Sequence, residues 1–285
     1  MKNKVNIFLT GGNGFIGKNI IEQLGEKYCI YAPTHKELDL LSTDKVEKFF
    51  QAHDIDVVIH TANIGGNTKE QKVQNILETN LRIFFNISRC SSYFKKMIHL
   101  GSGAEFGKQL PVINAREEAL GERIPTDEYG FYKFIVAKFI EETDLPIYNL
   151  RIFGIFGKYE DYSFRFISNI IYQALHNQPI VIKKNAVFNY IYVDDFIRLL
   201  SCFIEHNPTY KSYNIGFTRS YKLLDLAKLI LKIMKRNDKI HIIEKGFSNE
   251  YTCDITRLKN EKLPIRMQNI ERSISELIEW YKNTI

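Results

Sequence analysis

The sequence predicts an α/β protein built on a doubly wound parallel sheet, together with a smaller mixed α/β lobe. Short apolar runs that read as buried strands alternate with helical patterns, an order that gives a parallel sheet with helices on both faces. A glycine cluster also lies directly between the first strand and the first helix. The runs expected as strands span residues 5–10, 28–32, 56–62, 97–101 and 146–153.

Helical patterns fill the intervals between these strands, and a turn is expected at residues 63–67. The acidic segment 113–126 reads as a loop. Beyond residue 157 the alternation weakens, so we divide the chain into a first domain and a second lobe. The first domain is expected at residues 1–157 and the lobe at 158–186 and 217–285, with the strand and helix of 187–216 returning to the first domain or to the cleft.

Composition and charge exclude several classes of protein. The 285 residues are 45% hydrophobic and 25% charged, with a formal net charge of +6, as in ordinary soluble proteins. No apolar run approaches the roughly 20 residues that span a bilayer, and the run after the basic N-terminus is too short for a secretory signal. We therefore expect a cytoplasmic protein with no membrane partner.

Cysteine, histidine and basic residues are all scattered along the chain. The four cysteines form no C-x-x-C pattern and the seven histidines no i, i+4 pair, so neither a disulfide framework nor a metal site is expected. The densest basic stretch, residues 228–239, fits the solvated face of a helix. Nucleic acid is therefore not expected as a partner.

The glycine cluster predicts a dinucleotide-phosphate site. Glycines permit a tight turn and a close approach of the backbone to a pyrophosphate, while a helix N-terminus offers free N–H groups and a positive dipole end. The G-x-x-G-x-x-G pattern alone is weak, but here it has the strand-to-helix context that supports it. The residues expected to bind are Gly11, Asn13, Gly14, Phe15, Ile16 and Gly17.

The residues after the second strand bear on the choice of cofactor. An acidic residue there would bond the ribose 2′-hydroxyl of NAD. The sequence instead has His35 and Lys36, a basic pair that suits a 2′-phosphate, although both residues also fit a loop surface. NADP(H) is therefore favoured over NAD(H).

Tyr129 and Lys133 stand four residues apart at the start of an apolar helical segment, so they share one helix face. A cation beside a phenol lowers the phenol's pKa below its usual value of about 10, which suits proton transfer near neutral pH. The same spacing also fits a solvated helix face. Ser102 ends a predicted strand, so its hydroxyl is expected to face a ligand, although turn chemistry also explains a Ser-Gly pair.

With these pieces in order, the chain resembles the extended short-chain dehydrogenase/reductase family, particularly its nucleotide-sugar branch. The resemblance covers roughly residues 4–216 and implies a Rossmann domain and an NAD(P)-dependent oxidoreductase. The motifs that carry it are Thr10-Gly11-Gly12-Asn13-Gly14-Phe15-Ile16-Gly17, Asp56-Val57-Val58-Ile59-His60-Thr61-Ala62, Asn80, Ser102, Tyr129-x-x-x-Lys133, Leu150-Arg151-Ile152-Phe153, Tyr192-Val193-Asp194-Asp195 and Tyr213-Asn214-Ile215-Gly216.

The family's roles carry over onto matching positions. Tyr129 is implied as the general acid/base, Lys133 as the residue that holds the nicotinamide ribose and depresses the tyrosine pKa, and Ser102 as the hydrogen-bond partner of the sugar oxygen. Further cofactor contacts are expected from Asp39, Leu40, Thr61, Ala62, Asn80 and Phe153. Substrate contacts are expected from Gly65, Ser102, Gly103, Ala104, Tyr129, Gly154 and Arg165.

Departures from the family narrow the implied reaction. The 4,6-dehydratases carry an Asp-Glu pair where this chain has Gly103 and Ala104, so dehydration is disfavoured. GDP-fucose synthases, which look similar around residues 35–40, epimerise with a Cys and a His where this chain has Ala104 and Tyr159. With dehydration and this epimerisation disfavoured, the resemblance leaves reduction of the keto group as the implied reaction.

A further departure concerns the substrate's diphosphate. The family often has Arg-Asp-Phe where this chain has Phe188-Asn189-Tyr190, so another cation is needed. Arg165 is the candidate, with Lys158 behind it. Glu105 replaces a common apolar residue, and its role is left open between substrate and solvent contact.

The resemblance therefore implies an NADPH-dependent reductase of the 4-keto group of a nucleotide-activated deoxy sugar, in surface-polysaccharide precursor synthesis. The alternative is a nucleotide-sugar 4-epimerase with tightly bound NAD. A regulatory protein on the same fold is a third reading, disfavoured by the intact Ser102, Tyr129 and Lys133. A homodimer is expected from the family alone.

Overall fold

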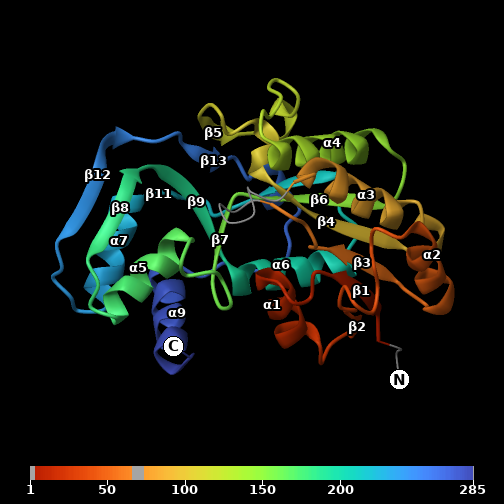
Figure 1. Ribbon diagram of the computed structural model, residues 1–285, viewed down its shortest axis with the longest axis horizontal. Helices are drawn as coiled ribbons and strands as arrows, with labels where there is room; N and C mark the ends of the chain where they lie inside the picture. The colour runs from red at the N-terminus through yellow and green to blue at the C-terminus, as the bar shows by residue number, and fades with distance from the viewer. Residues whose placement is uncertain (1–3, 66–73, 285) are drawn as a thin grey trace.

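A six-stranded parallel sheet forms the larger half of the molecule in this computed structural model, which describes residues 4–65 and 74–284 (Figure 1). The strands lie in the order β10-β6-β4-β3-β1-β2, and every neighbouring pair is parallel. Their bounds are β1 (Asn6–Thr10), β2 (Cys29–Tyr31), β3 (Val57–His60), β4 (Lys96–Ser102), β6 (Ile147–Ile152) and β10 (Ser212–Ile215). The predicted doubly wound sheet is confirmed.

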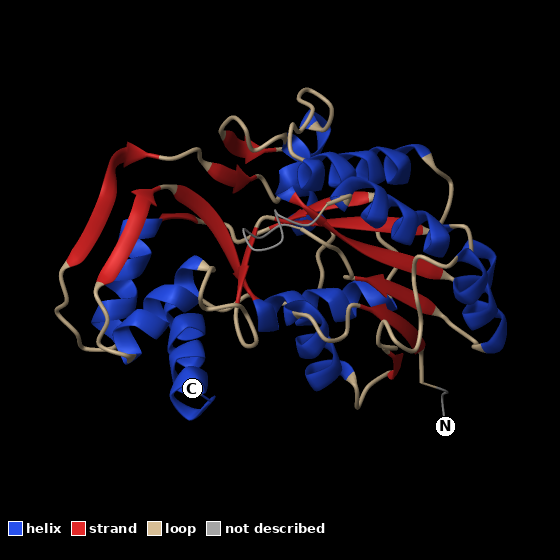
Figure 2. Cartoon of the chain, viewed as in Figure 1, coloured by secondary structure: helices blue, strands red, loops and turns tan. Residues whose placement is uncertain are grey.

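Helices cover both faces of this sheet (Figure 2). On one face lie α2 (Thr43–Ala52), α3 (Ile76–Ser88) and α4 (Glu128–Glu142), and on the other α1 (Phe15–Leu24) and α6 (Val193–Glu205). Strand side chains alternate between the two resulting cores: Phe8 and Val58 pack under α2 to α4, whereas Ile7 and Ile59 pack on the opposite face. This two-sided burial explains why the strands read as almost continuous apolar runs.

The smaller half is built from short strands and four helices. Strand β9 (Val187–Tyr192) pairs with β7 (Gly154–Phe156), β11 (Ser220–Lys222) and β13 (Tyr251–Cys253), while β8 (Ile180–Asn185) pairs with β12 (Ile240–Phe247). The helices are α5 (Phe166–Leu175), α7 (Leu223–Ile233), α8 (Thr256–Asn260) and α9 (Ile270–Thr284). The segment 187–216 contributes β9 to this half and β10 to the parallel sheet, so it joins the two.

The structure differs from the sequence prediction at several elements. The segment 113–126 is not all loop, because β5 (Val112–Ala115) pairs with β13, a partner almost 140 residues later in the chain. The exposed strand β12 has no alternating pattern that could reveal it. The helical pattern between the third and fourth strands is not one helix, because α3 ends at Ser88 and a separate 3-10 turn covers Ser91–Tyr93. Residues 66 and 67 of the predicted turn lie outside the described residues.

Helix lengths bear on the membrane question. The two longest helices of the described chain, α4 and α9, have 15 residues each. None within residues 4–65 and 74–284 is both long and apolar enough to cross a bilayer.

Phe84 tests the packing between α3 and α4. Its side chain is fully buried, and its ring packs against Phe85 and Phe139. We expect Phe84→Ala to lower the free energy of unfolding by about 3–5 kcal/mol, because it removes a large buried ring and leaves a cavity. Urea unfolding followed by circular dichroism measures this. Ile243→Ala in exposed β12, the control, should change the same quantity by less than about 0.5 kcal/mol, and equal effects would contradict the assigned core.

Candidate active site

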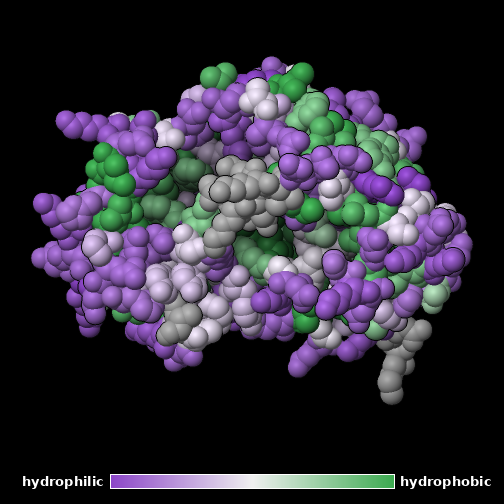
Figure 3. All heavy atoms as spheres, in the orientation of Figure 1, coloured by the Kyte–Doolittle hydropathy of each residue, from purple (hydrophilic) through white to green (hydrophobic). Residues whose placement is uncertain are grey.

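A cleft of about 1060 Å³ is lined by residues of both halves and lies at the carboxyl ends of the parallel strands. In doubly wound sheets this edge is where ligands bind. The space-filling view shows the surface hollowed between the halves, with hydrophobic side chains in part of the hollow (Figure 3). The cleft brings together residues from the glycine turn, the ends of β3, β4 and β6, helix α4 and the segment after β7.

The glycine turn forms one end of the cleft. Five of its six predicted residues line the cleft: Gly11, Asn13, Gly14, Phe15 and Ile16. Helix α1 begins after Gly14 without a side-chain cap, which leaves its first N–H groups available to a ligand. Gly17 lies behind the turn, where a Cβ atom would stand 2.2 Å from the Gly11 carbonyl oxygen. The turn therefore fits a pyrophosphate, with Gly17 serving the packing of the turn.

The residues that follow β2 line the same cleft. His35, Asp39 and Leu40 lie along it, whereas Lys36, which is exposed like His35, does not. The predicted basic pair is thus split, with only the histidine at the cleft. The sequence could not resolve this, because neighbouring residues in a loop point in different directions.

The end of β3 is held close to the glycine turn. Thr61 and Ala62 both line the cleft, and Thr61 donates its hydroxyl to the Thr10 carbonyl oxygen at 2.7 Å. Asn80 does not line it. The Asn80 amide instead donates to the Ile64 carbonyl and accepts the Ile64 N–H, both at 2.8 Å, and so fixes the chain after β3 to helix α3.

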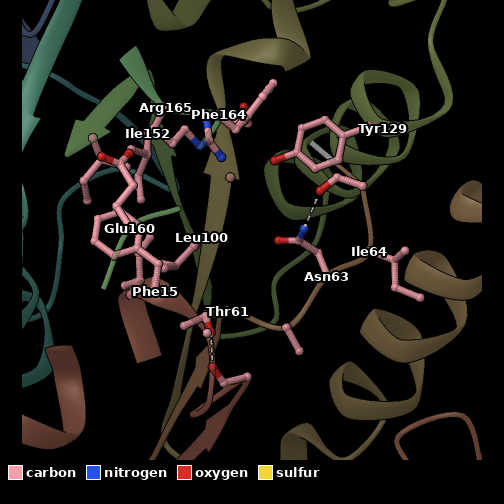
Figure 4. A pocket seen from close by; sticks show the side chains of 18 of the residues that line it. Phe15, Thr61, Asn63, Ile64, Leu100, Tyr129, Ile152, Glu160, Phe164 and Arg165 are labelled. Carbon is pink, nitrogen blue, oxygen red and sulfur yellow. Dashed lines mark hydrogen bonds between the residues drawn. The ribbon is translucent and has the colours of Figure 1, made fainter. Parts of the chain in front are cut away.

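The catalytic candidates converge at the middle of the cleft. Ser102 ends β4, and Tyr129 stands on the first turn of α4, whose N-terminus Asp127 caps by accepting the Gly130 N–H at 2.8 Å. The phenol of Tyr129 points into the cleft toward Arg165 (Figure 4). The Ser102 hydroxyl oxygen accepts the Ala104 N–H at 3.2 Å, which turns its hydrogen toward other acceptors.

Lys133 lies one helical turn after Tyr129 but does not reach the cleft. It is 2% exposed, and its ammonium nitrogen donates to the Leu100 carbonyl at 2.5 Å. The His99 ring nitrogen Nε2 lies 3.5 Å from the same atom. The lysine is therefore buried beneath the tyrosine, against β4.

Burial is the largest cause of the pKa shifts of both Tyr129 and Lys133 in the protein without bound ligands. It raises the pKa of Tyr129 to about 12, although the hydrogen bond with Ser102 opposes this. It lowers the pKa of Lys133 to about 7, opposed by the charge of Glu105. The prediction of a lowered tyrosine pKa is wrong for this state, because desolvation outweighs the Ser102 hydrogen bond and the charge of Arg165.

The predicted substrate residues fall into two groups. Gly65, Ser102, Tyr129, Gly154 and Arg165 line the cleft. Gly103 and Ala104 are buried behind it, and a Cβ atom on Gly103 would stand 2.7 Å from the Tyr251 hydroxyl.

Phe153, predicted as a cofactor contact, lines the cleft. Lys158, the second candidate for the diphosphate, does not, and it pairs with Glu22 at 3.2 Å.

Three further residues that line the cleft, Tyr251, Lys108 and Glu160, are not predicted from the sequence. The Tyr251 hydroxyl lies 3.4 Å from that of Ser102, and the Lys108 ammonium lies 5.9 Å from the rings of both Tyr129 and Tyr251. Glu160 lines the cleft, and burial raises its pKa to about 8. None of the sequence motifs named above includes Tyr251, Glu160 or Lys108.

Comparisons with known proteins identify the family of this chain. The model of the NAD dependent epimerase/dehydratase family matches residues 7–216. The chain is similar to GDP-L-colitose synthase of Yersinia pseudotuberculosis, at 25% identity over 97% of this chain and 92% of that protein. It is also 22% identical to an Arabidopsis thaliana trifunctional UDP-glucose 4,6-dehydratase, 3,5-epimerase and UDP-4-keto-L-rhamnose reductase, over 97% of this chain. The chain spans only 47% of that relative's length.

Solved structures share the fold. A GDP-mannoheptose C4 reductase from Campylobacter jejuni with NADP bound superimposes with a TM-score of 0.82 at 19% identity, over 99% of both chains. A UDP-glucose 4-epimerase from Thermotoga maritima superimposes with a TM-score of 0.82 at 21% identity, over 98% of this chain and 99% of that one. By its family match the chain belongs to the NAD dependent epimerase/dehydratase family, which confirms the resemblance to extended short-chain dehydrogenases/reductases.

Proposed function

We propose that the protein is an NADPH-dependent reductase of the 4-keto group of a nucleotide-activated deoxy sugar, in surface-polysaccharide precursor synthesis. The observation that carries this proposal is the pair of hydroxyls, Ser102 and Tyr129, that line one cleft. Gly103 and Ala104 occupy the positions where dehydratases eliminate water, and neither side chain can transfer a proton. Two similar proteins named above, a colitose synthase and a C4 reductase, point in the same direction.

The cleft fits a dinucleotide along its glycine-lined side. The pyrophosphate would meet the N–H groups at the start of α1, where Gly11 keeps φ at +73° and leaves no room for a side chain against Thr61. His35 would meet a 2′-phosphate, with Asp39 and Leu40 near the adenosine and Phe153 nearer the nicotinamide. When bound, the nicotinamide supplies the hydride.

Tyr129 would supply the proton for the reduction. Its raised pKa keeps the phenol protonated at neutral pH, which is the form that a proton donor needs. As negative charge gathers on the sugar oxygen, the Ser102 hydroxyl would donate a hydrogen bond to it, and the phenol proton would move from Tyr129 Oη to that oxygen. Lys133, charged on binding, would stabilise the tyrosinate left behind.

The remaining cations suit the substrate's diphosphate. Arg165 is exposed at the cleft, opposite Tyr129 (Figure 4), and Lys108 lies on the Tyr129 side. Both are available to phosphate oxygens, unlike Lys158. We further propose the division into a nucleotide-binding domain of residues 1–157 and a substrate lobe of 158–186 and 217–285, a cytoplasmic location, and a homodimer.

A nucleotide-sugar 4-epimerase is the second candidate, favoured by the likeness to a UDP-glucose 4-epimerase. Both reactions use the same tyrosine, lysine and serine. Purified protein separates them: retained NAD without net NADPH consumption would support the epimerase. Stoichiometric NADPH oxidation by nucleotide 4-keto sugars, with products identified by NMR, would support the reductase.

The first prediction concerns the phenol of Tyr129. Tyr129→Phe should lower kcat by about 10²-fold or more, because the proton donor is lost, while the Kd for NADPH changes by less than about twofold. The matched control is Tyr132→Phe on the same helix, since the buried Tyr132 hydroxyl has no hydrogen-bond partner among the described residues. Steady-state kinetics of both variants measure this, and equal effects would refute the assignment.

The second prediction concerns cofactor choice. His35 lines the cleft and Lys36 does not, so His35→Ala should weaken NADPH binding by about 10-fold, the worth of one charge-assisted hydrogen bond to phosphate. Lys36→Ala should weaken it less. Fluorescence titration with NADPH and NADH measures both affinities. A loss that is equal for the two cofactors would remove the basis for NADP.

The third prediction concerns Lys133 and pH. In the free protein the Lys133 ammonium binds the Leu100 carbonyl beneath the cleft; on cofactor binding we expect it to turn to the nicotinamide ribose, which should raise its pKa from about 7. A raised pKa in the complex means that NADPH affinity is highest below pH 7 and falls as pH rises through the pKa of the complex. Titrations between about pH 6 and 9 measure this slope. Lys133→Met should flatten it, and an unchanged slope in that variant would contradict the role.

A further inference from the structure

The carboxylate of Glu105 is buried directly beneath Ser102. It is 0% exposed, so it meets neither substrate nor solvent. It accepts the backbone N–H of Ser102 at 3.0 Å, the amide of Asn149 at 3.0 Å, and the guanidinium of Arg151. Burial raises the pKa of Glu105, and the three donating partners oppose this rise by favouring the ionised carboxylate.

Part of this arrangement is a helix cap. Ser102 and Glu105 form a capping box at the 3-10 turn Gly103–Phe106. A cap explains the bond from the carboxylate to the Ser102 N–H, but not the fully buried arginine bound to the same group. Buried ion pairs add little net stability over apolar side chains of similar volume, so stability alone does not explain this one.

Arg151 connects this carboxylate to the helix that carries the other catalytic candidates. Its Nε atom binds Glu105, and its terminal nitrogen donates to Glu141 of α4 at 2.8 Å. Gly101 leaves space for this cluster because it has no side chain. A Cβ atom there would stand 2.1 Å from the Asn149 amide oxygen and 2.4 Å from the Glu105 carboxylate. A chain of contacts thus runs from Ser102 through the buried Glu105 and Arg151 to the partly exposed Glu141, on the helix of Tyr129 and Lys133.

Ser102 is consequently held from two sides. Glu105 holds its backbone N–H, and the Ala104 N–H binds its hydroxyl oxygen at 3.2 Å. The first contact fixes the peptide and the second fixes the side-chain rotamer. The hydroxyl hydrogen is left to donate into the cleft.

We propose that Glu105 is a positioning residue, which acts through the Ser102 backbone and Arg151 to hold the Ser102 hydroxyl in register with Tyr129. The proposal rests on the proposed use of Ser102 and Tyr129 around one sugar oxygen, and it serves reduction and epimerisation alike. A misplacement of about 1 Å at a reacting centre costs up to about 10²-fold in rate, so such a clamp has a measurable effect.

A double-mutant cycle between Glu105 and Ser102 tests this. Glu105→Gln should lower kcat by about 10-fold with KM changed by less than about twofold, because only transition-state contacts are lost. In a Ser102→Ala background the same change should cost less than about twofold, since the group it positions is gone. Additive losses would overturn the proposal. Each variant is assayed at its own pH optimum, so that a shifted Lys133 pKa does not imitate a displaced serine.

The chain offers a matched control for burial. Glu117 is also buried, accepts the Asn214 backbone N–H at 2.8 Å and faces Arg257, but contacts none of the catalytic candidates. Glu117→Gln should leave kcat within about twofold even where it lowers stability. A loss equal to that of Glu105→Gln would mean that the effect is structural, and would overturn the proposal.

A second variant and a crystal structure test the proposal even if Glu105→Gln does not fold. If Glu105→Gln does not fold, Glu105→Asp takes its place in the cycle, because it keeps the charge for Arg151 but is too short to reach both partners. The cycle runs on whichever reaction the wild type catalyses, reduction or epimerisation. A crystal structure of the folded Glu105 variant should show a displaced Ser102 hydroxyl; an undisplaced one would overturn the proposal whatever that reaction is.

Discussion

The rest of the structure depends on the parallel pairing of β1 with both β2 and β3. Because β1 is followed by α1 on one face and its neighbour β3 by α3 on the other, the connections that leave these two strands diverge and leave a crevice above their carboxyl ends. The glycine turn closes one side of this crevice, and Thr61 binds back to Thr10 to hold it there. Ser102 and Tyr129 then reach the same crevice from β4 and α4.

Much of this could be predicted from local patterns. The sheet follows from strands that are apolar on both faces, and the glycine turn follows from its place between a strand and a helix. Tyr129, Ser102 and Arg165 lie at the cleft as the sequence predicts, since their positions depend on one helix or one strand end. Features that need a distant partner were missed, such as β5, which pairs with β13, and Tyr251, which approaches Ser102 across 149 residues of chain.

The ionisation states could not be predicted from spacing. A lysine four residues from a tyrosine suggests a lowered phenol pKa, but both groups are removed from water, and desolvation acts on each in the direction of its neutral form. Glu105 shows the same limit. Its sequence position leaves substrate and solvent contact open, whereas the structure supplies a third environment, a buried arginine.

Tyr251 lies on β13, well beyond residue 216, where the family match ends. Strand β13 also pairs with β9 and β5, and both of these strands come from the matched part of the chain. The boundary of sequence similarity is therefore not a boundary of the fold. A fragment that stopped at residue 216 would keep the residues of the glycine turn but would lose Tyr251 and the rest of the cleft lining that comes from the C-terminal part of the chain.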